Sequence, residues 1–211
     1  MRKFQRLPSP AFLVGKWEQW GLEWEQRLKA GAGAFFHWHE VDHEPVNHKL
    51  LPVLKDQVQD HCSFCDAFPV SPPSNPTIEH FRPKRRFPRE AYKWENLYYC
   101  CDHCQQKGED FDEAMLRPDG EDYSFDRFFH WDFTTGMLEI NEQASPEDQN
   151  RAKTTLQAYR LNTGHPLLRR QASYRRSRMP DESLDCFPYR DFVEPRLSLP
   201  APSREPYEPA S

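Results

Sequence analysis

The sequence predicts an α+β fold in which a metal ion holds a small central segment together and helices lie on its N- and C-terminal sides. Two Cys-x-x-Cys pairs, Cys62–Cys65 and Cys101–Cys104, predict the metal-held segment, because paired thiolates are the usual ligands of a closed tetrahedral zinc site. Apolar residues at helical spacing on both sides of it predict the helices. Two short apolar stretches, Thr77–Ile78 and Leu97–Cys100, predict strands inside it.

The composition limits the class of protein. The 211 residues are 37% hydrophobic and 29% charged, which fits one domain or a small core with appended segments. With a net charge of −5, any nucleic-acid site must be a local basic patch on an acidic body. No apolar run suits a signal peptide or a membrane span, so we expect no membrane partner. We expect a cytoplasmic, reducing compartment, where paired thiols bind metal more often than they form disulfides.

Residues 1–60 predict a helical N-terminal region. Ser9–Pro10 is a suitable helix start, and Gly31 a suitable stop. Apolar residues between them recur at helical spacing: Leu13, Trp17, Trp20, Trp24 and Leu28. This stripe is interpreted as facing the core, with a docking face for a partner as the alternative, since Trp is enriched at interface hot spots. A second helix over residues 50–59 would deliver the chain to the first cysteine pair.

Residues 119–180 predict a hairpin followed by helices. Residues 123–140 alternate around a Thr-Thr-Gly turn, which is typical of two paired strands. Ser145 precedes Pro146 and has an acidic residue three positions later, as at a capped helix start. Pro166 begins a further helix rich in arginine. Residues 181–211 are Pro-rich and lack periodicity, so they predict a disordered tail.

An acidic residue beside a histidine, Glu79–His80, lies between the two cysteine pairs. Phosphodiester hydrolysis needs a metal ion on the phosphate, a base for water and cations that position the backbone. Glu79 and His80 are candidates for the first two roles, and Asn96 can hold a histidine ring through its amide. The candidate phosphate-binding residues are Arg82, Lys84, Arg85, Arg86 and Lys107.

In their order, these motifs resemble those of an HNH nuclease, and within that superfamily the nuclease subunit of the Septu anti-phage system, which is also an effector of some retrons. The resemblance is strong over about residues 61–110, and it places an HNH nuclease core at residues 61–118. Its most specific elements are Glu79-His80-Phe81-Arg82-Pro83-Lys84 and Trp94-Glu95-Asn96-Leu97.

The resemblance implies a ββα-metal site, with a structural Zn²⁺ on Cys62, Cys65, Cys101 and Cys104 and a catalytic Mg²⁺ or Mn²⁺. His80 would be the general base, Glu79 a ligand of the catalytic ion, and Asn96 the residue that orients the histidine. The family usually continues Cys-Asn-x-x-Lys-Gly after the second pair, and that Asn is a metal ligand. Here Gln105 replaces it and Lys107 lies one residue closer. Gln105 is the expected third ligand, and His103, Asp110 or loss of activity are the alternatives.

Members of this family act beside an ATPase of the ABC or SMC-like kind. The resemblance therefore implies such a partner and a nucleic-acid substrate, with DNA expected ahead of RNA. A rival hypothesis is a zinc-stabilised module that binds nucleic acid or protein without catalysis, and a third is housekeeping or mobile-element DNA cleavage. Glu79–His80 favours an enzyme, because a binding module does not need this pair. Histidines 37, 39, 43 and 48 match no metal motif and are expected at the surface or in the core.

Overall fold

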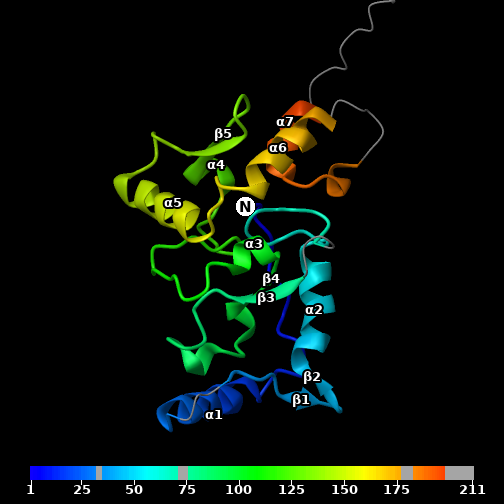
Figure 1. The fold of residues 1–211 in the computed structure, drawn as a ribbon, viewed down its shortest axis with the longest axis vertical. Coiled ribbons are helices and arrows are strands. Elements are labelled where there is room, and N and C mark those ends of the chain that lie inside the picture. Colours follow the sequence, from blue (N-terminus) through cyan, green and yellow to red (C-terminus); the bar gives the residue numbers. More distant parts are fainter. Residues whose placement is uncertain (32–34, 71–75, 177–182, 198–211) are drawn as a thin grey trace, which may run out of the picture.

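The computed structural model describes residues 1–31, 35–70, 76–176 and 183–197 and shows a mixed α+β fold. Three small antiparallel sheets of two strands each occur in these residues. Figure 1 shows helix α1 at one end of the molecule, helices α6 and α7 at the opposite end, and strands β3 and β4 between them. None of the described helices combines the length and apolar character needed to cross a membrane.

Helix α1 (Trp17–Lys29) lies against the short helix η1 (Pro88–Glu90). Trp20 and Trp24 are buried, so the aromatic stripe faces the core, as the sequence predicts. A Cβ added at Gly21 would lie 2.3 Å from the carbonyl oxygen of Arg89, and only glycine permits this close approach. The helix begins later than predicted because Gly15, at a φ of +72°, has a left-handed conformation that interrupts it.

The chain then forms strands β1 (Glu40–Val41) and β2 (Glu44–Pro45) and helix α2 (Val46–Gln57), which begins four residues before the predicted start. In the central segment, β3 (Thr77–His80) pairs antiparallel with β4 (Leu97–Cys100). This register places Glu79 opposite Tyr98 and His80 opposite Leu97. The short helix η2 (Trp94–Asn96) leads into β4, and one helical turn, α3 (Asp102–Gln105), follows it and packs against β3.

The predicted hairpin and helices of the C-terminal region are present. Helix α4 (Phe125–Phe128) precedes strands β5 (Phe129–Asp132) and β6 (Met137–Ile140), which pair antiparallel. Helix α5 (Pro146–Ala158) begins where predicted, because the side chain of Ser145 accepts a hydrogen bond from the backbone nitrogen of Asp148 at 3.1 Å. Helix α6 (His165–Arg176) follows.

The prediction of a disordered tail from residue 181 is wrong for residues 183–197. They form η3 (Leu184–Cys186) and helix α7 (Arg190–Leu197), and Phe187 and Phe192 are buried. The Nη2 of Arg190 lies 2.8 Å from Oδ1 of Asp66, and both side chains are buried. These aromatic and ionic contacts outweigh the Pro-rich composition, since a buried pair holds the segment on the loop that carries the first cysteine pair. Residues 181–182 and 198–211 lie outside the described residues.

Candidate functional site

Four buried cysteines form a cluster that is positioned to bind a metal ion. The sulfur atoms of Cys62, Cys65, Cys101 and Cys104 all lie within 4.8 Å of one another. The Sγ atoms of Cys65 and Cys101 are 3.6 Å apart. Four thiols and no other donor suit a closed tetrahedral zinc site, which leaves no open position for a substrate. The cluster joins the loop after α2 to the start of α3, so an ion bound there would stabilise the fold.

Cys100 is next to the cluster but is not part of it. Its Sγ donates to the carbonyl oxygen of Cys101 at 3.2 Å. Burial raises the pKa of the Cys100 thiol well above its ordinary range, which keeps this side chain protonated. The sixth cysteine, Cys186, is exposed.

His80 is at the end of β3 and is only 6% exposed. Its Nε2 lies 2.9 Å from the carbonyl oxygen of Ala91. A carbonyl can only accept, so Nε2 carries the proton and Nδ1 is the nitrogen that can accept one. Burial is the main cause that lowers the pKa of His80 to about 3, and the nearby ammonium groups of Lys84 and Lys107 add to it. The ring is therefore neutral at physiological pH, as a general base must be.

Glu79 is also buried and contacts a lysine. Its Oε1 lies 2.9 Å from Nζ of Lys107, whose side chain is fully buried. Nζ also donates to the carbonyl oxygens of Phe81 at 3.3 Å and Asp110 at 3.2 Å. Burial raises the pKa of Glu79 to about 7, although the charge of Lys107 opposes this shift. The ammonium group of Lys107 thus faces oxygens of the protein interior, and its predicted contact with substrate stays a prediction.

Asn96 holds the backbone that positions the histidine. Its Oδ1 accepts from the backbone nitrogen of Arg82 at 2.7 Å, and its Nδ2 donates to the carbonyl oxygens of Arg82 and Glu90, each at 3.0 Å. Ala91, whose carbonyl binds His80, directly follows Glu90. Asn96 therefore orients His80 through the main chain, and the described contacts contain no direct bond between the two side chains.

The described residues do not form a ready site for a catalytic divalent ion. In them, the four cysteines are the only group of three or more His, Cys, Asp or Glu donors close enough to hold a metal. Glu79 supplies one carboxylate, and the Lys107 ammonium contacts it. Gln105 lies beside β3, where its Nε2 donates to the carbonyl oxygen of Ile78 at 3.4 Å. The ring of His103 instead contacts the carbonyl oxygen of Arg160.

Two of the candidate phosphate-binding arginines contact oxygens of the protein. Arg82 forms ion pairs with Glu90 at 2.8 Å and Glu113 at 2.7 Å. Arg86 is exposed and donates to the carbonyl oxygen of Phe111 at 3.1 Å. A phosphate would have to compete with two carboxylates for Arg82, whereas a backbone carbonyl holds Arg86 less strongly.

Lys84 and Arg85 differ in their surroundings. Nζ of Lys84 lies 5.3 Å from the ring centre of Phe36, and burial lowers the pKa of this lysine. Arg85 is exposed. Among Arg82, Lys84, Arg85 and Arg86, Arg85 and Arg86 are therefore the exposed residues.

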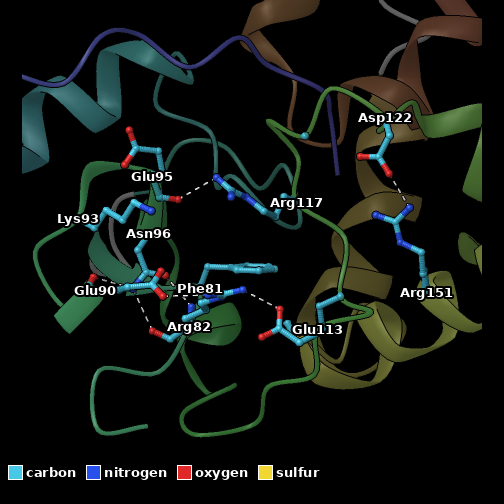
Figure 2. A pocket seen from close by; sticks show the side chains of 12 residues that line it. Phe81, Arg82, Glu90, Lys93, Glu95, Asn96, Glu113, Arg117, Asp122 and Arg151 are labelled. Atoms are coloured by element: carbon cyan, nitrogen blue, oxygen red, sulfur yellow. Dashed lines mark hydrogen bonds and ion pairs between the residues drawn. The ribbon is translucent and has the colours of Figure 1, made fainter. Parts of the chain in front are cut away.

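A polar cavity of about 280 Å³ lies on the side of the central segment where Asn96 and Arg82 are found. Figure 2 shows Arg82 facing Glu113, Arg151 facing Asp122, and Arg117 bonded to the main chain of Glu95. Glu79 and His80 do not line this cavity. Since acidic groups balance its cations, its walls do not form a phosphate site.

Sequence reasoning missed two aromatic residues that cover the histidine. Trp38 stacks on His80 with ring centres 5.5 Å apart and an interplanar angle of 20°, and Phe36 meets it edge-on at 5.4 Å. The feature of the sequence that could have predicted them is the run of aromatic residues and histidines over residues 35–39. The N-terminal histidines form no metal cluster among the described residues, and His39 stacks on Trp20 at 5.0 Å.

No model of a protein family matches this chain, and no curated protein matches it either. The fold and the site together define an α+β protein with a buried four-cysteine metal-binding cluster beside a buried Glu–His pair. The geometry of these residues therefore carries the functional inference.

Proposed function

We propose that this protein is an HNH-type endonuclease that hydrolyses phosphodiester bonds in nucleic acid, with His80 as the general base. One observation carries the proposal: the ring is held through Nε2 by the carbonyl oxygen of Ala91, so Nδ1 of a neutral imidazole can take a proton from water. Arg85 and Arg86 are exposed cations of the kind that binds a phosphate. Glu79 is the carboxylate that the resemblance assigns to the catalytic ion.

The pKa of His80 fits this role only in part. A base with a pKa of about 3 is neutral at pH 7, but it is weak. Access of water and the negative charge of a phosphate would both raise the pKa of the ring. The described arrangement therefore holds the histidine in its neutral form, and a bound substrate would strengthen it as a base.

The order of β3, β4 and α3 supports the same class of enzyme, because two antiparallel strands followed by a helix are what the resemblance to HNH nucleases implies. In this proposal zinc on the four cysteines is structural. A Mg²⁺ or Mn²⁺ ion on the phosphate is implied only by the resemblance. We also propose an ATPase partner and a role in anti-phage defence, as in the Septu systems that the sequence resembles.

A second function is favoured by a specific observation. The cysteine cluster is complete, whereas Glu79 is paired with Lys107 and His80 is covered. A zinc-stabilised module that binds nucleic acid or protein without catalysis would have this combination.

A digestion panel tests the proposal. The zinc-loaded protein is incubated with supercoiled plasmid, single-stranded DNA and tRNA, with Mg²⁺ or Mn²⁺, and with or without the candidate ATPase. We expect at least one substrate to be cut. Binding of these nucleic acids without cleavage under every condition would support the binding module and contradict the nuclease.

A further inference from the structure

Two rings from the N-terminal region lie on His80. Trp38 is nearly parallel to the imidazole, at 20° and 5.5 Å between ring centres, and Phe36 is nearly perpendicular to it, at 84° and 5.4 Å. These are contact distances for aromatic rings. They leave no room for a water molecule between the rings, which agrees with the 6% exposure of His80.

The segment over residues 35–39, here called the aromatic cap, is anchored at several points. The hydroxyl of Tyr92 donates to the carbonyl oxygen of His37 at 2.5 Å. The backbone nitrogen of Val46 donates to the carbonyl oxygen of His39 at 2.8 Å. The ring of Phe36 also meets that of Trp24 on α1, with 5.3 Å between ring centres. The cap is thus fixed to α1, to the start of α2 and to the loop before β4.

The cap has the features of a segment that opens locally. Its residues belong to no helix or strand. Phe35 is 84% exposed, while Phe36 and Trp38 are half-buried. Irregular surface segments can open locally at less than the global unfolding free energy. Apart from the ring contacts with His80, the anchors given above join the cap to α1, α2 and Tyr92 and not to β3 or β4, so its opening does not require those strands to unfold.

A general base must come within hydrogen-bond reach, about 2.6–3.2 Å, of the water that it deprotonates. Trp38 covers one face of the His80 ring, and Phe36 covers a further part of it. We infer that residues 35–39 are a removable aromatic cap and that the described arrangement is a closed resting state of the site. This inference rests on the proposed function for its purpose, but the covering of His80 can be measured independently of cleavage.

The test measures access to His80 in the full-length, zinc-loaded protein. Diethyl pyrocarbonate modifies unprotonated histidine rings, and peptide mass spectrometry locates each modified residue. The opened variant is Phe36→Ala/Trp38→Ala. Phe35→Ala is the matched control, because this neighbouring ring is exposed and does not touch His80. The exposed His43 is the internal reference in every sample.

We expect His80 to react slowly in the wild type and in Phe35→Ala, and at least about tenfold faster in the opened variant. Tyr92→Phe is the milder second variant, because it keeps the buried ring and removes only the bond to His37. Its expected gain is about fivefold, the factor that one hydrogen bond provides. Zinc content and circular dichroism confirm that each variant is folded.

The inference is overturned if His80 of the wild type reacts as fast as His43. It is also overturned if neither Tyr92→Phe nor a folded opened variant changes the rate at His80. Cleavage of the substrate panel is measured on the same samples. Faster modification with higher cleavage supports the cap and the nuclease together, whereas faster modification without any cleavage supports the cap and contradicts the proposed function.

Discussion

Lys107 and Glu79, the residue before His80, form a buried ion pair with 2.9 Å between Nζ and Oε1. The lysine comes from the turn after α3 and the glutamate from β3, so the pair ties the helix side of the central segment to the strand. Removal of one partner of a buried ion pair destabilises the fold, because the other charge stays buried without a partner. The pair therefore fixes Glu79 in place as long as both groups are charged.

Glu79 gives the fold a specific dependence on pH. Its pKa is about 7 in the folded chain, raised from 4.5 mainly by burial. The folded state then binds the proton more tightly than the unfolded state, so the free energy of unfolding falls as the pH rises from about 4.5 to 7. The shift corresponds to about 3 kcal/mol. We expect Glu79→Gln to remove this slope in denaturant titrations at pH 5 and pH 8. If the free energy of unfolding changed equally with pH in the wild type and in Glu79→Gln, the prediction would be contradicted.

The C-terminal helix should be held by Asp66 rather than by Asp185, although both contact Arg190. Asp66 is buried, whereas the side chain of Asp185 is 55% exposed, at 3.3 Å from Arg190. We expect Asp66→Ala to lower the free energy of unfolding by about 3 kcal/mol or more, and Asp185→Ala by less than about 1 kcal/mol. Urea titration measures both. Equal losses in the two variants would show that the buried pair does not anchor α7.

The metal-binding cluster should depend on Cys101 and not on its neighbour Cys100. We expect Cys101→Ser to lose the bound zinc and to unfold the central segment, because the ion joins loops that have little core of their own. Cys100→Ser is the matched control, since Cys100 is equally buried but lies outside the cluster. Metal content and melting temperature are measured for both. Full zinc content in Cys101→Ser would exclude it as a ligand.

The His80 ring should stay neutral over an unusually wide range of pH. Its lowered pKa of about 3 means that the folded chain does not protonate it in mild acid. Nitrogen chemical shifts of the imidazole report both the charge and the tautomer. We expect the proton to remain on Nε2 from pH 8 down to about pH 5, whereas a free histidine titrates near 6.5. A titration of the His80 signals near that value would mean that the ring is hydrated and its bond to Ala91 is not persistent.

Local sequence patterns predicted the parts of the site that depend on near neighbours. The Cys-x-x-Cys spacing predicted the metal-binding cluster, and the short apolar stretches between the two cysteine pairs predicted β3 and β4. The capped start of α5 was equally local, because Ser145 and Asp148 lie within one helical turn. Each of these predictions began from a pattern of residues a few positions apart, although the cluster itself joins two cysteine pairs that are distant in the chain.

The contacts that close the site could not be predicted in this way. Trp38 covers His80 from 42 positions away, and Lys107 reaches Glu79 from 28 positions away. Arg190 meets Asp66 across 124 positions. Such contacts depend on how the elements pack, which composition and periodicity do not record. For the same reason Lys107 was predicted to bind substrate and the segment around Arg190 was predicted to be disordered.

Cleavage by His80→Ala is the most direct test of the central claim, that this histidine acts as the base in phosphodiester hydrolysis. The variant is compared with the wild type and with His43→Ala, which alters an exposed histidine, under the conditions in which the wild type cuts. We expect His80→Ala to keep its zinc and its fold but to lose activity by about 10²-fold or more, and His43→Ala to be unchanged. Equal cleavage by wild type and His80→Ala would contradict the account.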